Sequence, residues 1–238
     1  MHPHADPIVC STKPFLFGRL PLAPSNPSVR KATIHFIKTR GGTFGITNQH
    51  VIHAYRCLAG ADKSVVCRID GLRIQPGDRL IDENAKLDIA TVSISESELN
   101  RIKTVPLFHG EWPVKRVMAR ETVLVSGYSS VHRTGGPEDG SEIRFMTLSV
   151  RVGSVSEKKF GLLLDPGDPM ARIVRDASGC AFSDLGGFSG SGVYRMNGTV
   201  LQLVGIAYAH QPAFDILYCT HSDYIRSDGR IQSDFVTT

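Results

Sequence analysis

Residues 186–209 read GGFSGSGVYRMNGTVLQLVGIAYA, and this stretch decides the fold class. Four glycines and two serines come first, and glycine lets the backbone take a positive φ or approach another group closely. Two strand-like runs follow, joined by Asn197-Gly198, the strongest short-range hairpin signal. The stretch therefore predicts a β-hairpin that follows a bend able to present its backbone N–H groups.

Similar strand patterns recur along the whole chain. Turns rich in Gly, Pro and Asp separate them. Only two stretches predict short helices, SESEL (95–99), in which Ser95 and Glu98 form a capping-box pattern, and residues 220–227. The sequence therefore predicts an all-β protein with little helix, built from two antiparallel six-stranded β-barrels packed side by side. The further predicted strands are residues 32–39, 44–52, 64–70, 87–94, 122–128, 143–155 and 161–165.

A connector between the two barrels is predicted at PLFHGEWPVKRVM (106–118), where two prolines and a charge cluster interrupt the strands. The expected organisation is an N-terminal segment (1–29), an N-terminal barrel (30–110), a linker (111–119), a C-terminal barrel (120–225) and a tail (226–238).

The composition excludes several classes of function. The net charge is only +4 and the basic residues are scattered, so a nucleic-acid partner is not expected. No apolar run approaches the roughly 20 residues that span a bilayer, and the first residues do not form a secretory signal, so neither a membrane partner nor secretion is expected. The cysteines are odd in number and lack CxxC spacing, which argues against a disulfide framework or zinc site and favours the cytoplasm. They are Cys10, Cys57, Cys67, Cys180 and Cys219.

Two short motifs precede the glycine-rich bend. GITNQHVI (45–52) places His50 among apolar residues, and LDIATV (87–92) interrupts an apolar strand with Asp88. A carboxylate so placed is rarely buried without a partner, and an imidazole N–H would serve as one. Taken singly, a structural histidine and a turn aspartate are the commoner explanations of these residues.

Together, the strings TNQHV, DIA and GFSGSGV resemble the motifs of the trypsin-like (chymotrypsin-fold) serine peptidases in the same order. His50 precedes Asp88 by 38 residues (88 − 50), and Ser189 follows Asp88 by 101 (189 − 88). The resemblance therefore implies two residues from the first barrel and one from the second, meeting in the cleft between them. In an α/β-hydrolase, by contrast, a helix would follow the serine and the chain order would be Ser, acid, His.

The resemblance also implies the role of each residue. Ser189 would be the nucleophile and His50 the general base and later the acid, while Asp88 would orient the imidazole and stabilise its cation. The backbone N–H groups of Gly187 and Ser189 would form the oxyanion hole. No cofactor and no metal are implied.

Two nearby residues are weak alternatives for these roles. Ser191 competes with Ser189 but fits the family's second small position, and His53 competes with His50 but lacks the surrounding motif.

The sequence departs from the family pattern at Phe188, where the digestive enzymes carry an aspartate that pairs with a newly cut N-terminus. Activation by cleavage is therefore not expected, and the chain is more similar to bacterial members of the heat-stress and glutamyl-endopeptidase type. Gln49 also replaces an alanine before the histidine, and Gly192 stands where proline is common.

The resemblance also implies a primary specificity pocket formed by Ser183 and Asp184, before the serine, and by Tyr208 and His210, after it. Asp184 would select a basic side chain, His210 an acidic one, and Tyr208 would fill the pocket and favour a small one. These three alternatives stay open.

The expected function is that of a serine endopeptidase acting on a protein or peptide substrate. The alternative is a latent or inactive trypsin-like module that binds a partner, or that an activating partner in a stress or defence pathway switches on by ordering the oxyanion bend. Phe188 motivates this alternative because it cannot form the usual ionic tether, and a flip of the Gly187–Phe188 peptide bond would turn one donor away.

Overall fold

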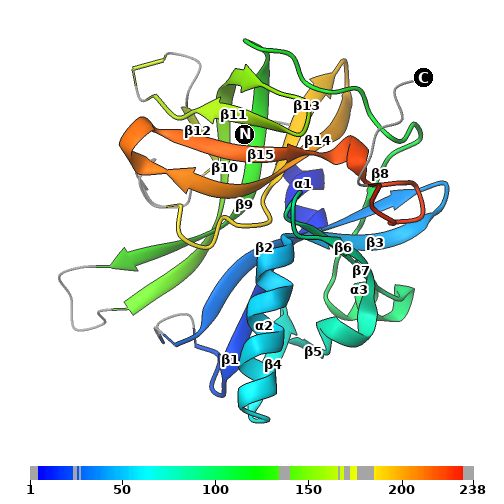
Figure 1. Cartoon of the computed structure of the whole chain (residues 1–238), viewed down its shortest axis with the longest axis vertical. Helices are drawn as coiled ribbons and strands as arrows, with labels where there is room; N and C mark the ends of the chain where they lie inside the picture. The colour runs from blue at the N-terminus through cyan, green and yellow to red at the C-terminus, as the bar shows by residue number, and fades with distance from the viewer. Residues whose placement is uncertain are drawn as a thin grey trace.

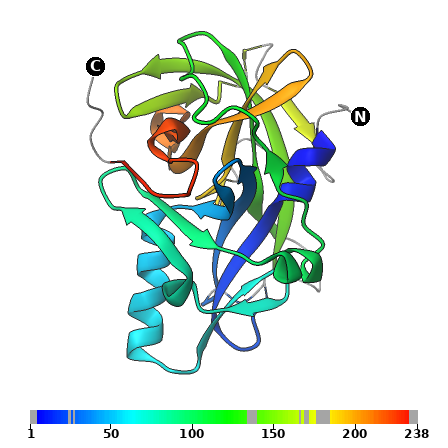
Figure 2. The ribbon, with the colours of Figure 1, turned by 90° about the vertical axis from the view of Figure 1, so that its right-hand side faces the viewer.

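The computed structural model describes residues 5–23, 26, 28–133, 140–165, 167–168, 172–175 and 185–232. The chain folds into two largely antiparallel β-sheets that lie one above the other in Figure 1, with the N-terminal half below. Figure 2 shows the same two halves from the side. The predicted all-β double-barrel fold with little helix is confirmed.

The N-terminal sheet follows the order β5-β4-β1-β2-β3-β7-β6, and β8 adds to β2 in parallel. Among the described residues its two end strands do not pair, so this sheet is a half-barrel. Its first strand lies within the segment that the sequence places before the barrel, yet Phe15 and Phe17 are buried in the core. The strands are β1 (Thr12–Arg19), β2 (Arg30–Thr39), β3 (Gly42–Thr47), β4 (Val65–Ile69), β5 (Leu72–Ile74), β6 (Leu80–Asn84), β7 (Ile89–Ser93) and β8 (Leu107–Phe108).

The N-terminal half also contains helices. The predicted strand over residues 44–52 is wrong beyond Thr47, because β3 ends there and Asn48 becomes the N-cap of α2 (Gln49–Ala61). The predicted capping box is confirmed in α3 (Glu96–Arg101). The other helices are α1 (Ala5–Ser11) and the 3₁₀ turn η1 (Pro76–Arg79). No helix of the described residues is long and apolar enough to cross a membrane.

The C-terminal sheet closes into a six-stranded barrel, because β10 pairs with both β9 and β11, and β12 attaches outside the ring. The predicted hairpin at Asn197-Gly198 is confirmed, and Gly198 has the positive φ of 61° that such a turn requires. The strands are β9 (Thr122–Arg133), β10 (Gly140–Val155), β11 (Lys159–Leu163), β12 (Arg172–Arg175), β13 (Gly192–Asn197), β14 (Val200–Gln211) and β15 (Ile216–His221). Two 3₁₀ turns, η2 (Pro212–Phe214) and η3 (Ser222–Tyr224), complete it, so the helix predicted over 220–227 is reduced to one turn.

The two halves share a third hydrophobic core between their own two cores. Ile37 and Phe44 from the N-terminal sheet meet Tyr194 and Ile206 from the C-terminal barrel, and Ile8 of α1 joins them. Because apolar burial is roughly proportional to the area removed from water, this shared core holds the sheets together.

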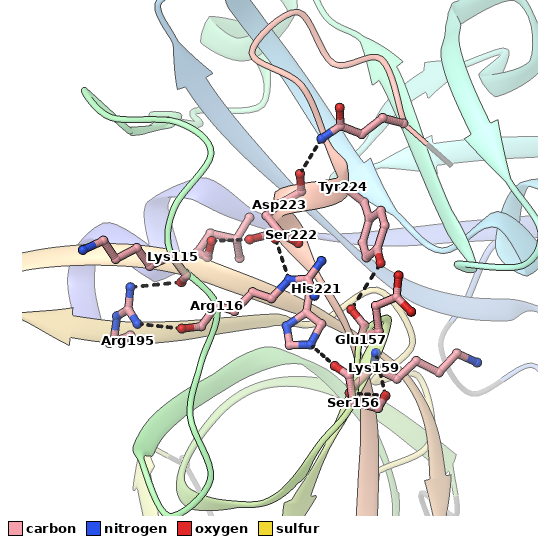
Figure 3. Close-up of polar contacts among 12 residues, drawn as sticks. Lys115, Arg116, Ser156, Glu157, Lys159, Arg195, His221, Ser222, Asp223 and Tyr224 are labelled. Carbon is pink, nitrogen blue, oxygen red and sulfur yellow. Dashed lines mark hydrogen bonds and ion pairs between the residues drawn. The ribbon is translucent and has the colours of Figure 1, made fainter. Parts of the chain in front are cut away.

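The connection between the halves is fixed to the C-terminal barrel. Arg195 of β13 donates to the carbonyls of Lys115 and Arg116, at 3.1 and 3.3 Å (Figure 3). Arg116 Nε in turn lies 2.7 Å from Asp223 Oδ2, and its guanidinium stands over the Tyr224 ring. The connection is therefore held by Arg195 of β13 and by Asp223 and Tyr224, which follow β15.

Residues 225–232, which we name the C-terminal segment, cross back onto the N-terminal sheet. Thr39 Oγ1 donates to the carbonyl of Ser227, and Thr91 Oγ1 donates to that of Gly229 at 2.6 Å. The N–H of Ile231 donates to a carboxylate oxygen of the β6 residue Asp82 at 2.8 Å. Residues predicted as part of a tail thus make one buried and two part-buried hydrogen bonds to the first half of the chain.

Candidate active site

His50 is the second residue of α2. Val51, Ile52 and Tyr55 turn into the core of the N-terminal half, so the opposite face of the first turn remains open. The His50 side chain is accordingly 48% exposed. The helix thus anchors the histidine through its neighbours while presenting the ring outward.

Asp88 holds His50 at two points. Its Oδ1 accepts the backbone N–H of His50 at 2.8 Å, and its Oδ2 lies 2.7 Å from His50 Nδ1. The first contact caps the N-terminus of α2, where a carboxylate is favourable. The second fixes the proton on Nδ1 and leaves Nε2 as the basic nitrogen of the ring.

Two consecutive turns explain the glycines around Ser189. Leu185 accepts the N–H of Phe188 at 3.0 Å, and Phe188 accepts the N–H of Ser191 at 2.9 Å. The third residues of these turns, Gly187 and Gly190, have φ of 86° and 85°, which is typical of type II turns and favours glycine. Ser189 is the second residue of the second turn and is partly exposed.

The Ser189 turn is seated against the N-terminal sheet. The β2 residue Thr33 donates its N–H to the Ser189 carbonyl at 2.8 Å, and a Cβ on Gly190 would lie 2.2 Å from the Thr33 carbonyl. That carbonyl also accepts the hydroxyl of Thr47, three residues before His50. The Ser189 turn therefore lies against β2. Through the Thr33 carbonyl it is linked to Thr47 at the end of β3, the strand that leads into α2 and His50.

The N–H groups of Gly187 and Ser189 donate to no acceptor within the described ranges of the chain. The Gly187 N–H belongs to the Gly186–Gly187 peptide unit. The prediction that a flip of the Gly187–Phe188 peptide bond would turn this donor away is therefore wrong, because only a flip of the Gly186–Gly187 unit would do so. The Gly187–Phe188 unit is held on both sides, because its carbonyl lies 3.4 Å from Thr33 Oγ1 and its N–H donates to Leu185.

Phe188 provides an apolar anchor for the turn. Its side chain is 2% exposed and belongs to the core of the C-terminal barrel. Burying a phenyl ring contributes roughly 1.5–3 kcal/mol. The loop therefore has a tether of a different chemical kind from the carboxylate that the family pattern leads one to expect.

The expected pocket residues are described only in part. Ser183 and Asp184 lie outside the described residues. Tyr208 is the extra residue of a bulge in β14, with its ring 6.3 Å from that of Tyr218 and 4.5 Å from Lys159 Nζ. Burial lowers the pKa of His210, whereas the nearby Asp215 carboxylate raises it.

Several residues of this region give no motif signal. His35 of β2 is fully buried, burial lowers its pKa to about 3, and its Nδ1 lies 3.2 Å from the Tyr194 hydroxyl. A Cβ on Gly192 would lie 2.7 Å from the His35 ring, which explains the glycine where proline is common. The only sequence signal is the polar alternation of Thr33 and His35 in β2, opposite the apolar core face.

Within the described ranges, no group of three or more His, Cys, Asp or Glu residues is arranged to hold a metal ion. Cys10, Cys57, Cys67 and Cys219 are free thiols, and burial raises the pKa of the last two. Cys57 Sγ lies 3.5 Å from His53 Nε2 on the exposed side of α2.

No protein-family model matches the chain, and no curated protein matches it. Among solved structures, the fold is similar to that of the thermostable serine protease AL20 from an extremophilic microorganism, with 11% identity, 89% of this chain and 91% of that chain covered, and a TM-score of 0.49. It is also similar to the tobacco vein mottling virus protease, with 9% identity, 98% and 94% coverage and a TM-score of 0.47. A scabies mite inactivated protease paralogue, S-I1, has 16% identity, 90% coverage of both chains and a TM-score of 0.47. The roles of individual residues therefore rest on the contacts within this chain.

Proposed function

We propose that the chain is a serine endopeptidase with Ser189 as nucleophile, His50 as general base and Asp88 as the residue that orients it. The observation that carries the proposal is the two-point attachment of Asp88 to His50, which fixes both the helix and the ring. The motif order, together with Phe188 in place of the pairing aspartate, makes the bacterial single-chain type the proposed relative.

The chemistry follows from the position of each proton. With its Nδ1–H directed to Asp88, His50 would take the Ser189 proton on Nε2 as the oxygen attacks the scissile carbonyl. The Asp88 carboxylate would stabilise the imidazolium, which then returns the proton to the leaving amine. Water would enter by the same route and release the acyl group from Ser189.

The developing oxyanion would be bound by the N–H groups of Gly187 and Ser189. Loss of one such donor typically lowers the rate by about 10²–10³-fold, so each of these two groups would contribute substantially to catalysis. The double turn supports this role because it leaves both N–H groups without an acceptor among the described residues.

A fluorophosphonate probe tests the proposal directly. We expect stoichiometric labelling of Ser189 in the wild type and none in Ser189→Ala or His50→Ala. Ser191→Ala is the matched control, because this neighbouring hydroxyl is buried and has no partner in the described part of the chain. Failure of folded wild-type protein to react, with and without cell extract, would overturn the assignment.

The second candidate is a module that remains latent until a partner orders the turn. Gly186 and Gly187 occupy both central positions of the first turn, so no Cβ hinders a flip of their shared peptide unit. Such a flip would turn the Gly187 N–H away from the oxyanion. Labelling that requires an added extract from stressed cells would favour latency, whereas labelling of the purified protein alone would favour constitutive activity.

The substrate that we propose is a protein or peptide in the cytoplasm, met without a cofactor. Incubation with a diverse peptide library, read by mass spectrometry, gives the preferred side chain at the cleavage site. Cleavage after acidic residues would assign the pocket to His210, cleavage after basic residues to Asp184, and cleavage after small residues to Tyr208.

A further inference from the structure

The backbone of Asp88 is in an unusual conformation. Its φ is +53°, in the left-handed region that residues other than glycine rarely occupy. Aspartate tolerates this region better than most residues, but the surrounding structure must still hold it there. Because the backbone conformation sets the direction of the side chain, the contacts that hold the backbone of Asp88 also determine where its carboxylate points.

Two buried side chains hold the carbonyls on either side of this conformation. Asn48 Nδ2 donates to the Asp88 carbonyl at 2.9 Å, and Thr220 Oγ1 donates to the Leu87 carbonyl at 2.7 Å. Asn48 and Thr220 are 0% and 1% exposed, so water does not compete for either bond. Asn48 precedes α2 in the N-terminal half, whereas Thr220 lies on β15 of the C-terminal barrel.

Asp88, and not the N-cap residue Asn48, accepts the helix N–H that an N-cap side chain usually accepts. Asn48 is the N-cap of α2, yet its side chain makes no cap bond and is directed to Asp88 instead. The helix N–H that such a cap would accept, that of His50, is accepted by Asp88. A helix cap of local origin is thus replaced by a reciprocal pair that ties the acid to the helix bearing the histidine.

Thr220 belongs to a part of the barrel that is itself fixed. The next residue, His221, has its Nε2 3.0 Å from the Ser156 carbonyl, and the Tyr224 hydroxyl donates to the Glu157 carbonyl at 3.1 Å (Figure 3). Asp223 is paired with Arg116 in the same cluster. Thr220 itself is paired with Lys159 of β11 and with Ile206 of β14, so its backbone belongs to the closed barrel that this cluster adjoins.

We propose that Asn48 and Thr220 are positioning residues that hold Asp88 against His50, one from each half of the molecule. The inference rests on the proposed function insofar as the aligned pair serves catalysis. It goes beyond that function by making alignment of the acid dependent on the packing of the C-terminal barrel, which also supplies Ser189.

The test compares Thr220→Val, which removes the hydroxyl at nearly constant shape, with Thr220→Ser, which keeps it. Thr39→Val is the matched control, since it removes another buried hydroxyl that reaches across the halves, to the Ser227 carbonyl, without touching Asp88. The first readout is the proton NMR resonance of His50 Nδ1–H, which reports the bond to Asp88 whether or not the protein is a protease. The second is kcat and KM on a cleaved peptide.

We expect Thr220→Val to shift or broaden the His50 resonance and to lower kcat about tenfold or more with little change in KM, since small misplacements of catalytic groups are costly. Thr220→Ser and Thr39→Val should keep the wild-type resonance. Asn48→Ala should reproduce the effect of Thr220→Val and serves in its place should that variant not fold.

A folded Thr220→Val or Asn48→Ala with a wild-type resonance would overturn the inference. A wild type that shows the resonance but neither cleaves peptides nor reacts with a fluorophosphonate would instead count against the proposed protease. The two failures are therefore distinguishable.

Discussion

Replacing Asp88 with asparagine should nearly abolish catalysis while leaving the fold intact. The backbone N–H of His50 can donate only to an oxygen, so the remaining amide oxygen should take the position that accepts it at 2.8 Å. The amide NH₂ then faces His50 Nδ1, where Oδ2 stood at 2.7 Å. Two donors cannot face each other at that distance, and the ring must carry its proton on Nε2 instead.

A ring protonated on Nε2 cannot accept the Ser189 proton. The same substitution in a Ser-His-Asp triad lowers kcat by about 10⁴-fold, which corresponds to about 5 kcal/mol of transition-state stabilisation at 1.36 kcal/mol per factor of ten. Loss of the negative charge at the N-terminus of α2 should in addition lower the stability by about 0.3–1 kcal/mol.

The assay is the second-order rate constant of fluorophosphonate labelling, together with a thermal melt. Asp82→Asn is the control, because its carboxylate also accepts a backbone N–H, that of Ile231, but has no contact with His50. We expect the control to label at the wild-type rate. A folded Asp88→Asn that labels within tenfold of the wild type would refute the tautomer reasoning.

Three further predictions concern the turn and the core. Phe188→Ala should lower the free energy of unfolding by about 3–5 kcal/mol, measured by urea denaturation, because the ring is fully packed in the C-terminal core. Gly190→Ala should abolish labelling with only moderate loss of stability, because its φ of 85° and a Cβ 2.2 Å from the Thr33 carbonyl both oppose a side chain; an active variant would contradict the seating of the turn. His35, with a folded-state pKa of about 3 against 6.5 when unfolded, binds its proton more readily in the unfolded chain, so stability should fall as the pH drops below 6.5. From pH 6.5 to 5 this amounts to about 2 kcal/mol, and a His35→Gln variant should show a shallower slope in urea titrations at the two pH values.

The sequence predicted those parts of the fold that local patterns encode. In β2, Ala32 and Ile34 alternate with Thr33 and His35, and this period of two is the signature of a strand. In the structure both sets of side chains are buried, on the two faces of the strand. The hairpin of β13 and β14 was likewise predictable from a local pattern, the Asn197-Gly198 dipeptide that joins the two strands. The suggestion that Asp88 needs an imidazole partner came from the cost of burying an unpaired carboxylate, and His50 lies at that position.

Other features have no local signature. FGITNQHVI (44–52) predicts a single strand because Val51 and Ile52 continue the β-branched pattern, whereas in the structure α2 begins after Asn48. The hydrogen bond from Thr220 to Leu87 joins residues that lie 133 positions apart. Such contacts arise only when the barrels pack, so a single sequence gives no spacing from which to predict them.

For the proposed protease, the return of the C-terminal segment to the N-terminal sheet would tie the timing of activity to protein synthesis. On the ribosome, the half that carries His50 and Asp88 emerges long before the residues that satisfy Thr39, Thr91 and Asp82. Domains generally fold as they emerge, but this half lacks those partners until residues 227–231 are free. A nascent chain should therefore remain unable to cut itself or its neighbours until translation has passed the last of these contacts.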